Sequence, residues 1–324
     1  MNVLVTGGAG YLGSLVSLTL LKAGCQVRAL DVLLYGGRSL LHLAGEPGFE
    51  FRRADIRDAD AVRSALAGME AVVHLAAIVG DPACARQPEL SVAVNRDAAV
   101  ELVRAAREAG VRRFVFASTC SNYGRMPDAS DPLTEDSGLR PLSLYAETKV
   151  AVERELLALP PRPMAATVMR FATLYGLSPR MRFDLTVNEF VMEMLVHGRL
   201  EVYGEQFWRP YVHVRDAARA IAMVLETDPS LVAGQVFNVG DTSENFRKKD
   251  ILDLVRCRAP SAEVRSVARA EDPRDYRVSF ERIRERLGYS ITRRVADGIG
   301  EVASALEAGL IENPRHHSHY NVSP

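Results

Sequence analysis

The first thirteen residues, MNVLVTGGAGYLG, join a short apolar run to three evenly spaced glycines. Residues 3–6 are typical of a buried strand and residues 11–22 of an amphipathic helix, so Gly7 and Gly10 lie on the turn between them and Gly13 lies in the first turn of the helix. Glycine allows a tight turn, and the backbone N–H groups at the start of such a helix attract a phosphate group. The segment therefore predicts a binding site for the pyrophosphate of a dinucleotide, with a plain structural turn as the alternative.

The second expected strand, residues 26–31, ends at an acid, Asp31. A carboxylate at this position accepts hydrogen bonds from the ribose hydroxyls of adenosine and repels a 2′-phosphate. Val32 follows it, whereas Arg28 and Arg38 are less well placed to receive that phosphate. The pattern favours NAD over NADP, and a turn cap is the alternative role for Asp31.

Short apolar runs alternate with longer amphipathic ones over the first half of the chain. Such alternation is typical of a doubly wound parallel sheet, the Rossmann α/β architecture. The expected strands cover residues 3–6, 26–31, 51–53, 71–75, 113–118 and 166–170, and the expected helices cover residues 11–22, 58–67, 89–109 and 143–158.

Beyond residue 176 the alternation loosens, and Pro, Gly and Arg interrupt the apolar runs. We expect residues 1–176 to form a dinucleotide-binding domain, to which residues 211–241 return. Residues 177–324 would then form a smaller mixed lobe that covers the sheet and binds the substrate.

The composition is that of an ordinary globular enzyme, with 48% hydrophobic and 25% charged residues. A formal net charge of -1 favours neither nucleic acid nor an anionic membrane as a partner. No apolar run approaches the roughly 20 residues of a membrane helix, and the N-terminus lacks the pattern of a signal peptide.

The four cysteines have no C-x-x-C or metal-ligand spacing. We therefore expect a reduced, cytoplasmic protein without a metal site.

Tyr145 and Lys149 are four residues apart on an expected helix, so they share one face. An ammonium group near a phenol favours the phenolate, so we expect Lys149 to lower the pKa of Tyr145 for proton transfer. The preceding strand ends in Ser118 and Thr119, whose hydroxyls would face the ligand crevice of an open α/β sheet. The alternatives are a solvated helix face and a capping hydroxyl.

Further segments match one family when they are taken together with TGGAGYLG. They are HLAA from His74, STCSNYG from Ser118, YAETK from Tyr145, RFATLYG from Arg170, RPYVHVRD from Arg209 and FNVGDT from Phe237. The chain resembles the extended short-chain dehydrogenases/reductases, in particular NAD-dependent nucleotide-sugar epimerases and dehydratases of the UDP-galactose 4-epimerase type. The resemblance implies that NAD contacts Gly7, Gly10, Tyr11, Leu12, Gly13, Asp31, Asp55, Ile56, Leu75, Ala76, Ala77, Asn95, Tyr145 and Lys149.

The resemblance also implies a catalytic set of Thr119, Tyr145 and Lys149. Tyr145 would exchange the proton of the reacting hydroxyl, Lys149 would hold the nicotinamide ribose, and Thr119 would orient the substrate oxygen. A nucleoside-diphosphate sugar is the implied substrate. A homodimer formed through the helices at 89–109 and 143–158 is the implied assembly.

Two positions depart from the dehydratase branch of this family. In that branch an Asp and a Glu directly follow the threonine, as the acid and base of water elimination, but here Cys120 and Ser121 follow it. Elimination of water by that route is therefore disfavoured. Thr173 also replaces the Asn that the family usually has in RFATLYG, which leaves its substrate contacts open.

A nucleoside diphosphate needs cationic partners, and the planar fork of an arginine suits it. In the family, the arginine that opens RPYVHVRD contacts the diphosphate. The expected substrate contacts are Val79, Gly80, Asp81, Cys120, Ser121, Asn122, Thr173, Arg180, Arg182, Asn188, Arg209 and Arg274.

Our main hypothesis is an epimerase that oxidises a ring hydroxyl transiently and returns the hydride to the other face of the sugar. A reductase of a nucleotide-linked 4-keto sugar is the first alternative. A non-catalytic NAD-binding regulatory protein is the second.

Overall fold

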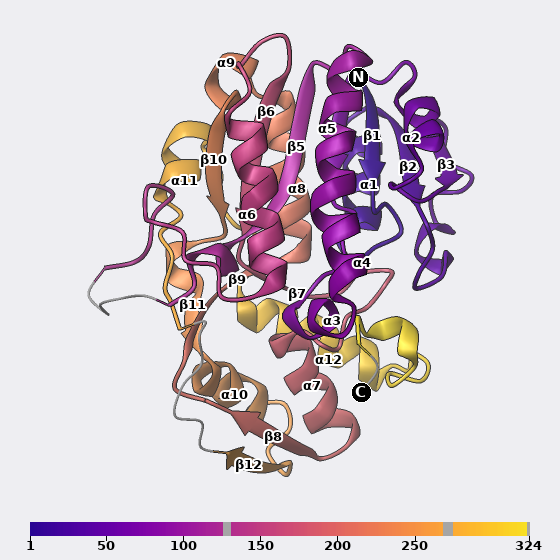
Figure 1. The fold of residues 1–324 in the computed structure, drawn as a ribbon. Helices are drawn as coiled ribbons and strands as arrows, with labels where there is room; N and C mark the ends of the chain where they lie inside the picture. The colour runs from indigo at the N-terminus through magenta and orange to yellow at the C-terminus, as the bar shows by residue number, and fades with distance from the viewer. Residues whose placement is uncertain (126–130, 268–274, 323–324) are drawn as a thin grey trace.

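The structure is a computed structural model that describes residues 1–125, 131–267 and 275–322. A seven-stranded sheet forms its centre, and all neighbouring strands in this sheet are parallel (Figure 1). The order across the sheet is β10 (Gln235–Val239), β6 (Ala165–Phe171), β5 (Arg113–Thr119), β4 (Ala71–His74), β1 (Asn2–Thr6), β2 (Gln26–Asp31) and β3 (Phe49–Arg53). The predicted doubly wound α/β sheet is confirmed.

Helices cover both faces of this sheet, which explains why inner strands such as β1 and β4 are short, mostly buried apolar runs. On one face α1 (Gly13–Lys22) packs against α8 (Val214–Glu226), and together they bury one apolar cluster. On the other face α2 (Ala59–Leu66), α5 (Ala99–Glu108) and α6 (Leu144–Leu157) bury a second cluster. Figure 1 shows α5 and α6 in front of the sheet.

The helix predicted at residues 89–109 consists of three segments. They are α4 (Pro88–Val92), a π-helical segment (Ala93–Ala98) and α5. Asn95 lies in the π-helical segment and makes two hydrogen bonds to Ile78 in the loop after β4, donating to its carbonyl oxygen over 2.9 Å and accepting from its N–H over 2.7 Å. The wider π turn is thus placed where the helix fixes a loop at the sheet edge.

Two smaller sheets lie outside the large one, and most of their residues come from the expected smaller lobe. β9 (Trp208–His213) pairs parallel with β7 (Thr173–Tyr175) and antiparallel with β11 (Asn245–Arg247). β8 (Arg199–Tyr203) pairs parallel with β12 (Glu263–Val267). The predicted mixed lobe is therefore confirmed. Its helices surround a separate apolar cluster and are α7 (Thr186–Val196), α10 (Lys248–Arg256) and α12 (Val295–Glu307).

Between residues 211 and 241, α8 and β10 return to the large sheet as its covering helix and its outermost strand. The division of the chain after residue 176 stays a prediction. In the described ranges no helix is both long and apolar enough to cross a membrane. The remaining α-helices of those ranges are α3 (Asp81–Arg86), α9 (Pro229–Val232) and α11 (Glu281–Leu287).

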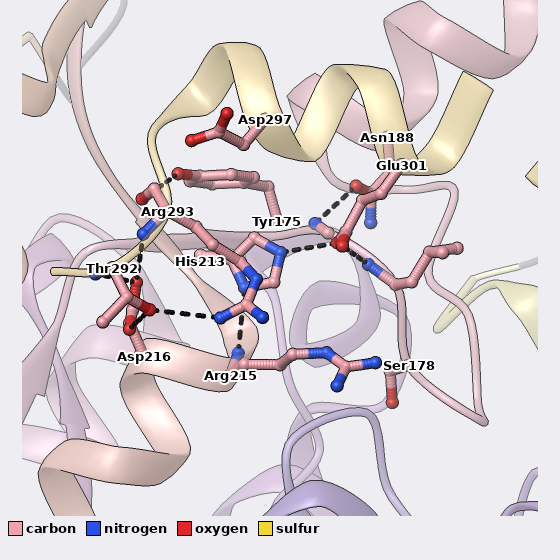
Figure 2. A network of polar contacts seen from close by, with 12 residues as sticks. Tyr175, Ser178, Asn188, His213, Arg215, Asp216, Thr292, Arg293, Asp297 and Glu301 are labelled. Carbon is pink, nitrogen blue, oxygen red and sulfur yellow. Dashed lines mark hydrogen bonds and ion pairs between the residues drawn. The ribbon is translucent and has the colours of Figure 1, made fainter. Parts of the chain in front are cut away.

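A polar network around the buried His213 joins the lobe to the large sheet at the bend after β7 (Figure 2). His213 Nδ1 accepts from the N–H of Arg215 at the start of α8, so its ring proton lies on Nε2, 2.5 Å from Glu301 Oε1. Glu301 also accepts from the N–H of Leu177 over 2.7 Å. These bonds hold α12 against the chain segment that leaves the sheet, and this segment forms one wall of the site.

Candidate active site

A cavity of about 440 Å³ lies at the carboxyl edge of the large sheet, between the sheet and the smaller lobe. Ligands of open α/β sheets bind at this edge. The loops after β1, β2, β4 and β5 line the cavity together with residues from β7 to the start of α7. The predicted site residues that line it are Gly7, Gly10, Tyr11, Leu12, Gly13, Asp31, Asp55, Ile56, Leu75, Ala76, Ala77, Val79, Gly80, Thr119, Ser121, Tyr145, Lys149, Thr173, Arg180 and Arg182.

The glycine turn leaves no room for side chains. Gly7 has a φ of +73°, and a Cβ there would lie 2.7 Å from the backbone nitrogen of Ala76. A Cβ on Gly13 would lie 2.0 Å from the carbonyl oxygen of Gly7. Because only glycine permits this close approach of helix α1 to the turn, the N–H groups at the start of the helix stay accessible to a pyrophosphate.

Asp31 ends β2 and both lines the cavity and shapes the turn that follows. Its Oδ2 accepts from the N–H of Ala9 over 3.0 Å, and its Oδ1 accepts from the N–H of Leu33 over 2.7 Å. Burial raises the pKa of the Asp31 carboxyl above its ordinary value. Arg28 points elsewhere, because it pairs with Glu50 at 2.6 Å. This end of the cavity thus fits the adenosine ribose of NAD better than a 2′-phosphate.

Tyr145, Lys149 and Thr119 meet at the other end of the cavity. Lys149 Nζ donates to the carbonyl oxygen of Ala117 over 2.8 Å and lies 5.9 Å from the centroid of the Tyr145 ring. Thr119 Oγ1 accepts from the N–H of Ser121 over 3.1 Å, so its hydroxyl caps the turn and also lines the cavity.

The titration of Tyr145 differs from the expectation drawn from the sequence. Burial raises the pKa of its phenol in the cofactor-free chain, where a neighbouring ammonium was expected to lower it. The charge of Arg182 opposes this rise but does not cancel it. Burial also lowers the pKa of Lys149 to about 8, so its ammonium still carries its charge at neutral pH.

The comparisons with known proteins agree with this geometry. The NAD dependent epimerase/dehydratase family model matches residues 3–240. The chain belongs to this family. A dTDP-glucose 4,6-dehydratase of Streptomyces griseus is 33% identical over 312 residues, which are 92% of this chain and 92% of the relative. A UDP-glucose 4-epimerase of Streptomyces lividans is 30% identical over 309 residues, which are 90% of this chain and 91% of the relative.

Solved structures of the family superimpose over nearly the whole chain. DesIV, a dTDP-glucose 4,6-dehydratase from Streptomyces venezuelae solved with NAD and TYD bound, has a TM-score of 0.86 at 29% identity and covers 97% of this chain and 99% of its own. The UDP-glucose 4-epimerase of Thermus thermophilus, solved with NAD, has a TM-score of 0.83 at 29% identity and covers 95% of this chain and 99% of its own. Membership of this family makes the chain an enzyme with NAD as its cofactor. Since epimerases and dehydratases are similarly close, the family alone does not fix the reaction.

The loop after β5 holds the two positions at which this chain departs from the dehydratases. Hydrogen bonds on the side away from the cavity hold this loop in place. Cys120 is buried and its thiol donates to the carbonyl oxygen of Arg170 over 3.3 Å. Asn122 is buried too, and its amide donates to Ser118 and Glu153 over 3.0 and 2.8 Å. Neither side chain lines the cavity, so the predicted substrate contacts of Cys120 and Asn122 are replaced by a role in holding the loop.

Other predicted contacts also act from outside the cavity. Asn95 binds the backbone of Ile78. Asp81 accepts from the hydroxyl of Ser143 over 2.7 Å, at the start of α6.

Two predicted substrate residues of the smaller lobe lie behind the cavity wall. Asn188 is fully buried, accepting from the N–H of Gly176 over 2.9 Å and donating to the Tyr11 hydroxyl over 3.1 Å. Arg209 lies 5.7 Å from the ring of Tyr276, which itself lines the cavity. Arg274 lies outside the described residues.

Among the cavity residues that the sequence did not reveal are Tyr35, Tyr276 and Asn321, whose side chains carry polar groups. Tyr276 directly follows the DPRD run in which an arginine was singled out, so its position carried a signal. Tyr35 and Asn321 had none, because they reach the cavity from a loop and from the distant end of the chain. Among the described residues, no group of three or more His, Cys, Asp or Glu side chains has the arrangement of a metal site.

Proposed function

We propose that this enzyme is an NAD-dependent nucleotide-sugar epimerase that oxidises a ring hydroxyl transiently and returns the hydride to the opposite face. The distribution of carboxylates carries the proposal. Within the described residues, the acidic side chains that line the cavity are Asp31 and Asp55, both at the adenosine end. Elimination of water needs a general acid and base beside the sugar in addition to the tyrosine that serves the oxidation, whereas return of a hydride needs no such further pair.

Each residue at the Tyr145 end has a defined part in this reaction. NAD, when bound, supplies the hydride acceptor and a positive charge that acts to lower the pKa of Tyr145. The Tyr145 phenolate takes the proton of the reacting hydroxyl and later returns it. Lys149 holds the cofactor ribose and adds a second positive charge, and the Thr119 hydroxyl orients the substrate oxygen.

Arg182 is the cation that we assign to the substrate side. It is 8% exposed, lines the cavity, and is held by Asp184 through two hydrogen bonds of 2.7 and 3.0 Å. Its charge acts on the Tyr145 phenol, which places it near the reacting end. A diphosphate there would be received by an arginine whose geometry is already fixed.

The test uses purified enzyme without added cofactor and a panel of UDP-, dTDP-, GDP- and CDP-sugars, with the products separated by chromatography. We expect one sugar to equilibrate with its epimer while the nucleotide stays attached. Consumption of stoichiometric NADH with a 4-keto sugar would instead identify a reductase. Formation of a 4-keto-6-deoxy sugar would identify a dehydratase and overturn the proposal.

A further inference from the structure

A segment from the far end of the sequence, residues 315–322, lies along the outer wall of the cavity. Tyr320 is buried against Phe183, whose N–H donates to the carbonyl oxygen of His319 over 2.9 Å. Val322 packs in the apolar cluster of Ile78 at the Tyr145 end. We call residues 315–322 the closing segment.

Asn321 bridges two loops of the large sheet. Its side-chain Nδ2 donates to the backbone carbonyl oxygen of Val79 over 2.9 Å. Its backbone carbonyl oxygen accepts from the Tyr35 hydroxyl over 3.5 Å. Val79 follows β4 and Tyr35 follows β2, and β1 lies between these two strands in the sheet. The glycine turn follows β1, so Asn321, which lines the cavity, joins the two loops that flank this turn.

Arg180 fastens the closing segment to the cavity. Its Nε donates to Ser318 over 3.1 Å, and its Nη2 donates to the Asn321 side chain over 2.8 Å. The guanidinium also lies 4.0 Å above the Tyr35 ring. Burial lowers the pKa of Arg180 to about 10, so it remains a cation at neutral pH. Its Nη1 makes no hydrogen bond to any residue that the structure describes, although Arg180 lines the cavity.

We propose that the closing segment and Arg180 form the outer half of the NAD site, facing the pyrophosphate across from the glycine turn, so that NAD leaves only when the segment undocks. Arg180 then serves the cofactor, whereas the sequence assigned it to the substrate. The arrangement suits an enzyme that recycles its cofactor. The proposal concerns NAD exchange and does not depend on which sugar reacts.

The test is the exchange rate of bound NAD for its fluorescent 1,N6-etheno analogue in the purified holoenzyme. In Asn321→Ala the hydrogen bonds to Val79 and Arg180 are lost, and exchange should accelerate by about tenfold or more. His317→Ala is the matched control, because its exposed side chain contacts only the neighbouring ring of His316 among the ring contacts of the described residues, within the same segment. Equal exchange rates in Asn321→Ala, His317→Ala and the parent enzyme would overturn the proposal.

A second measurement needs no variant and separates a closing role from simple packing. Hydrogen–deuterium exchange of the peptide that covers residues 315–322 is compared in cofactor-free and NAD-loaded enzyme. Slower amide exchange in the loaded enzyme is expected, because bound NAD holds the segment closed. Identical exchange with and without NAD would contradict the proposal even if every sugar were still epimerised.

Discussion

Lys149 of α6 donates from Nζ to the backbone carbonyl oxygen of Ala117 in β5 over 2.8 Å. Only 3% of Lys149 is exposed, and its Nζ lies 4.7 Å from the centroid of the Phe116 ring. This contact joins the helix that carries Tyr145 to the strand that ends in Thr119. It therefore fixes the relative positions of the three residues that we propose as catalytic.

Replacing Tyr145 by Phe removes the proton acceptor and retains the ring. Turnover should fall by about 10²-fold to 10⁴-fold, because general acid–base catalysis contributes on this scale. The affinity for NAD, measured by titration of the cofactor-free enzyme, should change little since the aromatic packing remains. Activity that survived in Tyr145→Phe would remove Tyr145 from the mechanism.

The buried Lys149 makes the stability of the cofactor-free enzyme depend on alkaline pH. Burial lowers the pKa of its ammonium from 10.5 to about 8. The unfolded chain therefore binds more protons between these two values, and the contribution of this site to the free energy of unfolding rises with pH across that window. Relative to Lys149→Met, the free energy of unfolding of the wild type should rise by on the order of 3 kcal/mol as the pH crosses this window, measured by urea denaturation. A difference between the two proteins that stays constant with pH would refute this.

Glu153 and Arg170 form a buried ion pair of 2.7 Å behind the proposed catalytic loop, and they are 1% and 3% exposed. Glu153→Gln leaves the guanidinium buried without its counter-charge, so the free energy of unfolding should fall by about 3 to 5 kcal/mol. The control is Glu101→Gln, which breaks an exposed pair with Arg104 and should cost less than about 1 kcal/mol. If chemical denaturation gave the same loss of unfolding free energy for both variants, burial of the ion pair would not determine its contribution to stability.

The closest approach in the glycine turn predicts a sharp contrast between two alanine substitutions. In Gly13→Ala the new Cβ would meet the Gly7 carbonyl oxygen at 2.0 Å, whereas a Cβ on Gly45 meets nothing within 4 Å. Gly13→Ala should lose about 1 to 3 kcal/mol of stability through overpacking and should purify without NAD. Gly45→Ala should keep both properties. The ratio of NAD to protein after gel filtration checks the second effect.

The parts of the site that the sequence predicted are those encoded by short, contiguous patterns. Gly7, Gly10 and Gly13 are fixed by one strand–turn–helix unit, and Tyr145 with Lys149 by the spacing of one helix. Asp31 follows from the end of one strand. Such local geometry is set by neighbouring residues, so the pattern predicts which groups reach the cavity.

The polar residues that the sequence assigned to ligand contacts were harder to place. Asn95, Asn122 and Asn188 all satisfy buried backbone or side-chain groups of the protein. A buried amide is equally suited to a ligand or to such a group. Which partner it meets depends on the packing of elements far apart in the sequence, as does the arrival of Asn321 at the cavity. The homodimer expected through α5 and α6 also stays a prediction.

In the proposed reaction, the hydride that is removed from the sugar returns to the same sugar, and no water is lost. The most direct measurement is mass spectrometry of the nucleotide sugar after incubation with the enzyme in D₂O, without added cofactor. We expect an epimer whose mass is unchanged once its hydroxyl and N–H groups have exchanged back in H₂O, because the hydride on carbon never exchanges with solvent. A product that has lost water or has gained deuterium on carbon would contradict it.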